Sequence, residues 1–214
     1  MNAGRSGLNE FYGSEAQLRL YHARYMPFVD TTPREVPILD LACGSGVFME
    51  LAQARGRAVE GVEHAAEAAK LARAKGFSVS QDDALRFLEM KQEAFAFIYC
   101  SHLIEHLLPA DARRLLELAY RALVHGGRLW INTPNPASFE VISEIFWLDP
   151  THVRPYPLPL LANMLQRAGF EIIAQGHDNA PMLPRRTLPR RIWLRLILGR
   201  HYGHMNTFLC GEKS

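Results

Sequence analysis

The stretch that decides the fold reads Ile38-Leu39-Asp40-Leu41-Ala42-Cys43-Gly44-Ser45-Gly46. An apolar strand runs into a turn flanked by glycines, and a helical pattern opens directly after it. Glycine is needed where the backbone φ is positive or where a ligand must approach the main chain. The helix that follows presents free N–H groups that can bind an anionic group, here a carboxylate. The stretch therefore predicts a strand–turn–helix unit that binds a ligand at its turn.

Short apolar runs alternate with helical segments on both sides of this unit. The expected strands are 38–42, 58–62, 77–80, 95–100, 129–132, 170–174 and 206–210, and the expected helices are 14–30, 48–55, 65–74, 84–90, 111–124 and 158–168. Such alternation is typical of βαβ units and of a parallel sheet covered on both faces. We therefore expect an α/β three-layer sandwich. An N-terminal helical segment (1–36) precedes the main domain (37–214), which carries a basic insertion at about 177–204.

Composition limits the classes of protein that fit. The chain has 214 residues, of which 48% are hydrophobic and 21% charged, so it can bury a core and is not a disordered protein. Its net charge of +2 is too close to balance to predict a nucleic-acid binder. Its three cysteines have no paired spacing, and neither a signal peptide nor a membrane span is visible. These features favour a cytoplasmic protein with reduced thiols.

Acidic side chains follow three expected strands. Asp40 lies just before the glycine turn, where it would repel a pyrophosphate and suit a cationic cofactor that carries an amino group. Met49 stands where a dinucleotide site requires a small residue. Glu63 ends the second strand, where an acid can hold both hydroxyls of a ribose, and Asp82 and Asp83 follow the third strand. These positions predict a nucleoside site at the carboxyl edge of the sheet.

The sequence resembles the class I S-adenosylmethionine (SAM)-dependent methyltransferases over about residues 36–175. The resemblance rests on LDLACGSG, Glu63, the pair Asp83-Ala84 and LVHGGRL, the segment that leads into strand five. In this lead His125 replaces the usual proline. The resemblance implies a mostly parallel seven-stranded sheet with an antiparallel last strand, and SAM as the cofactor. The expected cofactor-binding residues are Asp40, Ala42, Cys43, Gly44, Ser45, Gly46, Glu63, Asp82, Asp83, Ala84 and Ser101. A nucleotide-sugar or NAD-dependent enzyme and a non-catalytic scaffold are the rival interpretations.

Histidines and one glutamate are the candidate catalytic groups. If a helix begins at Ser101, then His102, Glu105 and His106 share one face beside the expected methyl group. A hydroxyl acceptor must lose a proton, which a histidine can take. The segment DPTHVRPY (149–156) could fold over this edge and bring His152 towards Glu105 and His106. The alternatives are that these residues pack or cap the helix start, or that they bind a metal ion.

Two further resemblances concern the acceptor and the metal. TPNP (133–136) followed by DPTHVRPY resembles a methyltransferase subset associated with polysaccharide and lipopolysaccharide biosynthesis, which implies a sugar or a glycan phosphate as acceptor. The Glu105-His106 pair resembles magnesium-assisted quinone methyltransferases and metal-dependent RNA 2′-O-methyltransferases. Those enzymes carry an acid where His102 stands, so we do not favour a divalent metal and assign no metal-binding residue.

The insertion contains a run, 185–200, with six arginines and no acid. Ile192, Trp193, Leu196 and Ile197 form an apolar stripe if this run is helical. A basic amphipathic helix can lie on the inner face of a membrane or bind phosphates, and it can equally pack over the sheet with its arginines in water. An aromatic platform for single strands is missing, which argues against nucleic acid as a partner. The sequence leaves the oligomeric state open.

Overall fold

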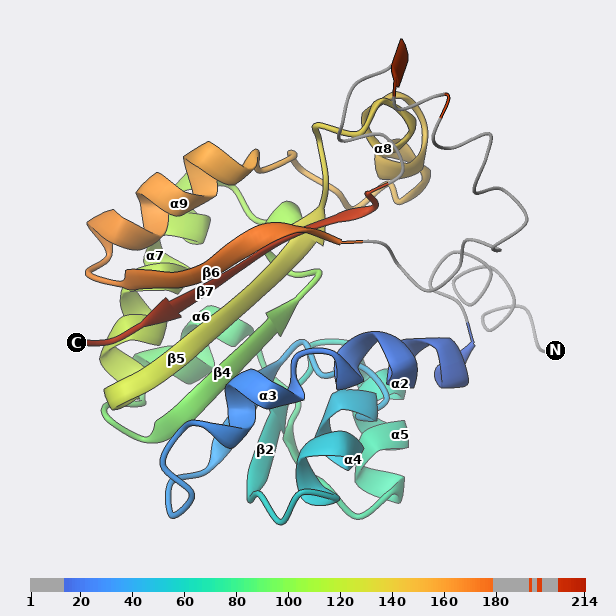
Figure 1. The fold of residues 1–214 in the computed structure, drawn as a ribbon. Helices are drawn as coiled ribbons and strands as arrows, with labels where there is room; N and C mark the ends of the chain where they lie inside the picture. Colours follow the sequence, from blue (N-terminus) through green and yellow to red (C-terminus); the bar gives the residue numbers. More distant parts are fainter. Residues whose placement is uncertain (1–13, 179–192, 194–195, 198–203) are drawn as a thin grey trace, which may run out of the picture.

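The computed structural model describes residues 14–178, 193, 196, 197 and 204–214. Seven strands form one sheet in the order β3-β2-β1-β4-β5-β7-β6 (Figure 1). Their bounds are β1 Ile38–Leu41, β2 Val59–Val62, β3 Ser78–Ser80, β4 Phe95–Ser101, β5 Leu123–Pro134, β6 Glu171–Asp178 and β7 Asn206–Glu212. Strand β7 is antiparallel to both β5 and β6, and the pairs from β3 to β5 are parallel. The expected seven-stranded sheet with an antiparallel last strand is confirmed.

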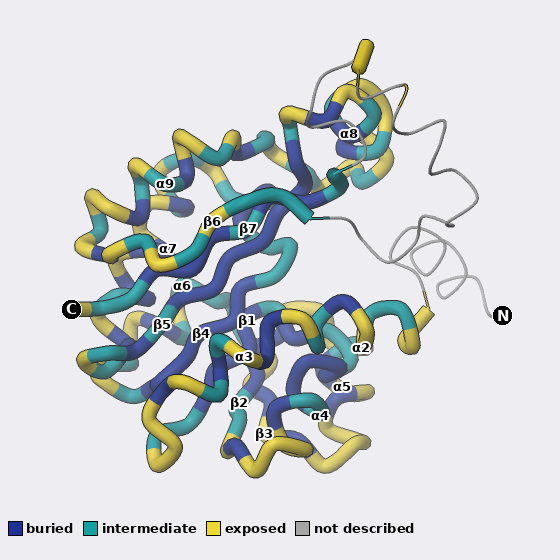
Figure 2. Tube along the Cα trace, viewed as in Figure 1, coloured by how far each residue is buried: buried dark blue, intermediate teal, exposed yellow. Residues whose placement is uncertain are grey.

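Helices cover both faces of the sheet, which completes the three layers. The helices are α2 Glu15–Ala23, α3 Met26–Asp30, α4 Val47–Gln53, α5 Ala66–Ala74, α6 Ala84–Glu89, α7 Pro109–Ala122, α8 Phe139–Ser143 and α9 Leu158–Arg167. Tyr21 of α2 and Phe48 of α4 pack with Trp130 on one face, while Leu116 of α7 and Leu161 of α9 pack on the other. The buried residues follow the central strands and the inner sides of these helices (Figure 2).

The prediction of one helix over 14–30 is wrong. Ser14 caps α2 through a reciprocal pair of hydrogen bonds with Gln17, but α2 ends at Ala23 and α3 begins at Met26. Pro27 lies in the first turn of α3, where its missing N–H is not needed. Inside a continuous helix the same proline would lose a hydrogen bond to the residue four positions earlier, so the helix breaks before it.

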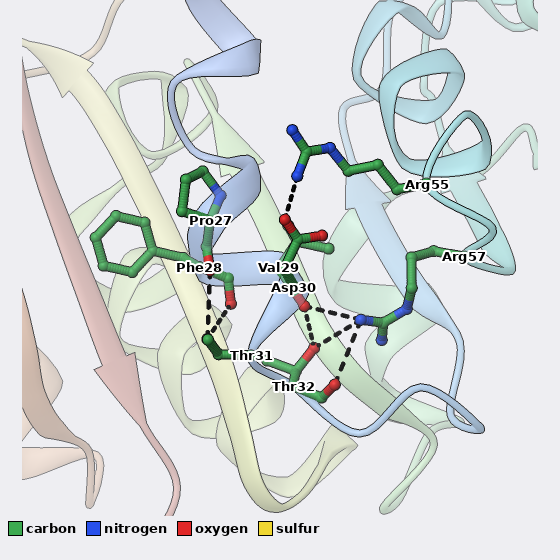
Figure 3. A network of polar contacts seen from close by, with 8 residues as sticks. All are labelled: Pro27, Phe28, Val29, Asp30, Thr31, Thr32, Arg55 and Arg57. Atoms are coloured by element: carbon green, nitrogen blue, oxygen red, sulfur yellow. Dashed lines mark hydrogen bonds and ion pairs between the residues drawn. The ribbon is translucent and has the colours of Figure 1, made fainter.

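Arg57, which lies ahead of β2, fixes the end of α3 to the sheet. Its side chain is buried at 3% exposure and donates to the backbone oxygens of Val29 at 2.8 Å and Pro33 at 2.7 Å. It also donates to the hydroxyl of Thr32 at 3.2 Å. Figure 3 shows the bonds of Arg57 to Val29 and Thr32 beside the exposed ion pair between Arg55 and Asp30. One buried guanidinium therefore satisfies the carbonyls at the C-terminal end of α3.

We expect Arg57→Met to lower the free energy of unfolding by about 3 kcal/mol, because it leaves several buried carbonyls without donors. Arg55→Met is the matched control, since an exposed ion pair contributes less than about 1 kcal/mol. Urea unfolding followed by circular dichroism measures both variants. Equal effects of the two substitutions would show that Arg57 does not anchor α3.

Most of the basic insertion lies outside the described residues. Residues 177 and 178 belong to β6 and not to an insertion. Of the predicted apolar stripe the structure describes Trp193, Leu196 and Ile197, whose side chains are exposed. A contact of 185–200 with a membrane stays a prediction. Within the described part of the chain, no helix is both long and apolar enough to cross a membrane.

Candidate active site

A cavity of about 1220 Å³ lies at the carboxyl edge of the strands, between α2 and the segment that follows β5. Pockets for one small ligand usually measure about 300–1000 Å³, so this one can hold a cofactor and an acceptor side by side. All the predicted site residues line the cavity except Gly46 and Glu105. The strand ends therefore bring the predicted residues together in one place.

The glycine turn has the backbone conformation that its sequence predicts. Gly44 has a φ of 54° and Gly46 a φ of 83°, both in the left-handed region. A Cβ on Gly46 would lie 3.2 Å from the ring of Phe77, so the absence of a side chain at position 46 lets the turn pack closely against Phe77. Ala42 also adopts a positive φ, of 58°, which costs a non-glycine residue on the order of 1–3 kcal/mol. Strain of this kind is concentrated at functional sites.

Two carboxylates line the half of the cavity that lies beside the glycine turn. Glu63 accepts hydrogen bonds from the backbone N–H groups of Gly44 and Ala65, both at 2.8 Å, so its position is fixed before any ligand binds. Asp40 is only 2% exposed. Burial, together with the charge of Glu63, holds the pKa of Asp40 well above its ordinary value. A cation placed between these two groups would relieve both effects.

We expect Asp40→Asn to stabilise the ligand-free protein and to weaken its binding of SAM by at least about tenfold. The raised pKa means that the folded state resists ionisation of Asp40, so the wild type loses stability as the pH rises above the ordinary carboxyl pKa, and the variant does not. Thermal unfolding between pH 5 and pH 7.5, with and without SAM, measures both effects. A variant that is less stable than the wild type, or that binds SAM equally well, would contradict this role.

Asp82 and Asp83, which follow β3, make different hydrogen bonds. One oxygen of Asp83 caps α6 by accepting from the N–H groups of Leu85 at 2.9 Å and Arg86 at 3.1 Å. Asp82 accepts from the N–H of Asp83 at 2.8 Å. Both acids and Ala84 line the cavity, where they can meet the adenine. Asp83 therefore caps the start of α6 and also lines the cavity.

His102 and Glu105 form an oriented pair at the other half of the cavity. The Nδ1 atom of His102 lies 3.0 Å from Oε1 of Glu105, and the hydroxyl of Thr133 donates to Oε2 at 3.0 Å. Glu105 is wholly buried. Burial alone would raise its pKa, but the hydrogen bond and the charge of His102 outweigh burial and hold the pKa below its ordinary value. The buried carboxylate of Glu105 therefore orients the imidazole of His102 through its Nδ1 atom.

The prediction that His102, Glu105 and His106 share one helical face is wrong. The turn after β4 is a short 3₁₀ helix, Ile104–His106, and His102 precedes it with a φ of 52°. The Nδ1 atom of His102 contacts Glu105 across this turn, while a ring nitrogen of His106 lies within 4.8 Å of a carboxylate oxygen of Glu105 without bonding to it. The Nδ1 atom of His106 is 2.9 Å from the hydroxyl of Thr151.

The segment 149–156 does fold onto this edge. The N–H of Val153 donates to the backbone oxygen of Glu105 at 2.8 Å, and the rings of His106 and His152 lie 4.7 Å apart. The Nδ1 atom of His152 is 2.6 Å from the backbone oxygen of Phe146, whereas its Nε2 is buried without a partner among the described residues. The catalytic roles of His106 and His152 stay predictions.

Glu105, His106 and His152 could also hold a metal ion. One ligand atom from each lies within 4.8 Å of the others. Both oxygens of Glu105 are, however, already bonded to His102 and Thr133, which makes Glu105 a poor ligand. We therefore expect methyl transfer to survive dialysis against a chelator. Activity that disappears on dialysis and returns with a divalent cation would establish the metal site instead.

Helix α2 supplies lining residues that the sequence did not reveal, among them Tyr21 and His22. The Nδ1 atom of His22 is 2.8 Å from the hydroxyl of Tyr99. Burial, with the nearby charge of His102, lowers the pKa of His22 to about 3, so its ring is neutral. The spacing of the aromatic residues in 14–30 indicated only a buried face. Nothing in the sequence showed that this face also closes a cavity.

The sheet order, the glycine turn and the acids at successive strand ends define a class I SAM-dependent methyltransferase domain. The family model described as "Methyltransferase domain" matches residues 12–175, and the chain belongs to this family. SAM is accordingly the cofactor of the domain.

Individual relatives agree with this assignment. The chain is 32% identical over 104 residues to the ubiquinone biosynthesis O-methyltransferase of Idiomarina loihiensis. The match covers 46% of this chain and 42% of that protein, so it spans less than half of the relative's length. A SAM-dependent methyltransferase from Archaeoglobus fulgidus superposes with a TM-score of 0.80 at 25% identity and covers 96% of this chain and 97% of its own. The geranyl diphosphate C-methyltransferase of Streptomyces coelicolor shares the fold, with a TM-score of 0.70, 17% identity and coverage of 93% and 80%.

Proposed function

We propose that the protein transfers the methyl group of SAM to a hydroxyl oxygen of an acceptor that has an apolar body. The proposal is supported by His102, which lines the cavity and whose Nδ1 atom is held by the buried carboxylate of Glu105 behind it. A base oriented by a buried carboxylate is the arrangement that removes a proton from a hydroxyl group.

The half of the cavity between the glycine turn and α6 would hold the cofactor. Asp40 would receive the amino group of SAM, directly or through water, and Glu63 would hold the ribose hydroxyls. Asp82, Asp83 and Ala84 would line the adenine site. The backbone of Gly44 and Ser45 lets the cofactor approach closely.

The reaction itself is an in-line displacement. The acceptor oxygen attacks the methyl carbon, the carbon–sulfur bond breaks, and S-adenosylhomocysteine (SAH) leaves with the electron pair. The hydroxyl proton passes to Nε2 of His102. The main demand on the protein is alignment of oxygen, carbon and sulfur, which a cavity that binds both ligands together provides.

The acceptor half of the cavity supports an apolar body. Its described lining includes Leu103, Leu107, Val141, Ile145 and Phe146. Among the described lining residues there is no lysine or arginine, so no cation is in place for a phosphate. The name of the Idiomarina relative, which methylates in ubiquinone biosynthesis, fits this kind of acceptor.

A sugar or glycan acceptor is the second candidate. It is favoured by the placement of Asp149, Thr151 and His152, all from the segment DPTHVRPY, along the same cavity. Polar side chains of this kind suit a hydroxylated ring. The arginines that would bind a glycan phosphate belong to 185–200 and lie outside the described residues.

Incubation with SAM labelled in its methyl group tests the proposal. Alkylated phenols and catechols are compared with methyl glycosides and with lipid, glycan and small-molecule fractions of a cell extract. We expect label in the phenolic or lipid-extractable compounds. Label confined to glycan material would select the second candidate, and label on nitrogen or carbon would refute O-methylation.

A further inference from the structure

The segment 139–148 carries exposed apolar side chains beside the acceptor half of the cavity. It comprises α8 and the 3₁₀ helix that follows it, and we call it the cap. Phe146 of the cap is buried and lines the cavity, whereas Phe139 and Trp147 are 63% and 59% exposed. Leu148 lines the cavity and is exposed as well. The cap therefore joins the acceptor half of the cavity to an apolar outer surface.

Trp147 presents this surface without an unpaired polar group. Its Nε1 atom donates to the backbone oxygen of Ile142 at 2.7 Å, so the indole N–H is satisfied within the cap. Of the three tryptophans in the chain, Trp130 is buried, and Trp147 and Trp193 are exposed. Exposed aromatic rings that gather at one place are typical of surfaces that contact a protein or a membrane.

The described part of the insertion adds a second exposed apolar face. Trp193, Leu196 and Ile197 are helical, their spacing is that of one side of a helix, and all three side chains are exposed. The insertion returns beside the cap, because the N–H of Asn135, four residues before α8, donates to the backbone oxygen of Met205 at 2.9 Å. Figure 1 draws the described residues of the insertion at the end of the molecule that carries α8.

Charge indicates which partner suits these two faces. The run 185–200 contains six arginines and no acid, whereas residues 135–153 contain three acids and no lysine or arginine, so positive charge predominates. Anionic lipid headgroups attract arginine, and tryptophan and leucine side chains enter the boundary between headgroups and acyl chains. A lipid surface also adapts to the apolar groups that meet it, whereas a folded partner would need a matching shape.

We propose that the protein binds the surface of anionic lipid bilayers through the exposed apolar side chains of the cap and of Trp193, Leu196 and Ile197. Because Leu148 belongs both to this surface and to the cavity lining, bound protein has the acceptor half of its cavity beside the lipid. The inference concerns where the protein acts and is separate from the proposed function, which concerns the atom that is methylated.

Sedimentation of the full chain with vesicles of phosphatidylcholine, with and without phosphatidylglycerol, tests the proposal. We expect the partition coefficient to be at least about tenfold larger when phosphatidylglycerol is present, and to fall as salt is added. The double variants Phe139→Ser/Trp147→Ser and Trp193→Ser/Leu196→Ser should each bind the anionic vesicles at least about tenfold more weakly.

Met90→Ser/Leu71→Ser is the matched control, because it removes two exposed apolar side chains from other parts of the surface, and it should bind vesicles as the wild type does. Binding of SAH without vesicles should be unchanged in every variant, which shows that the fold is intact.

Three results would overturn the inference. The first is that the wild type does not sediment with anionic vesicles at low salt. The second is that both serine variants from the cap and the insertion bind as the wild type does, since the arginines would then act alone. The third is a wild-type dimer in vesicle-free solution that both variants abolish, which would assign the two faces to a second copy of the chain.

Discussion

Replacing His102 with alanine should lower the rate of methyl transfer to a hydroxyl acceptor by about 10²–10⁴-fold, the range that a general base contributes. The imidazole is held by Glu105, which in turn accepts from Thr133, so the proposed base is already oriented at the cavity wall before substrate arrives. SAM binding should stay within about twofold of the wild type, since the cofactor half of the cavity is unchanged. Single-turnover measurement with labelled SAM separates the chemical step from binding.

Two further variants test the residues that hold the imidazole of His102 in place. Glu105→Gln should lower the rate by less than His102→Ala, because the imidazole remains but loses its charged partner. Thr133→Val should have the smallest effect of the three, since it removes one hydrogen bond to the carboxylate. A rate for His102→Ala within threefold of the wild type would show that His102 is structural and would move the base to His106 or His152.

Replacing Glu63 with alanine should weaken SAM binding by about 10²–10⁴-fold. Two hydrogen bonds from the ribose hydroxyls to one carboxylate are worth about 1.5–3 kcal/mol each. The carboxylate also accepts the N–H groups of Gly44 and Ala65, so the variant loses the support of the glycine turn as well. Calorimetry with SAM and SAH measures the affinity.

The control for Glu63 is Glu60→Ala in β2, the strand that Glu63 directly follows. Glu60 is partly exposed and its carboxylate lies 3.7 Å from Lys91, so its loss should leave cofactor affinity unchanged. Circular dichroism of both variants shows whether the fold is intact. Unchanged SAM affinity in a folded Glu63→Ala variant would discard the assignment of the ribose site.

Local patterns in the sequence were sufficient to predict the sheet and to bring most of the predicted cofactor-binding residues to one cavity, while their roles stay predictions. The alternation of apolar runs and helical segments predicts the order of strands and helices. The acids at the strand ends predict which edge of the sheet binds the ligand. The bulk of Met49 argued correctly against a dinucleotide site, but how the fold accommodates it was not visible. A Cβ on Gly61 would lie 2.9 Å from Sδ of Met49, so a glycine in β2 provides the space.

The catalytic half could be predicted only in part, because long-range contacts build it. The positive φ of His102 replaces the expected helix with a tighter turn, and no spacing rule for helices foresees it. Thr133 of β5 contacts Glu105, which lies in the turn after β4. Tyr21 of α2 contacts Asn132 of β5. Contacts across such separations depend on sheet order and register, which single-sequence patterns do not specify.

Whether the edge of β1 to β3 binds a sulfur nucleoside is measured by calorimetric titration of the purified wild-type protein with SAM and with SAH. We expect one site per chain for both compounds, with affinity in the range of about 1 μM–1 mM, and loss of that binding in Glu63→Ala. If neither compound binds at millimolar concentration, the edge of β1 to β3 is not a SAM site.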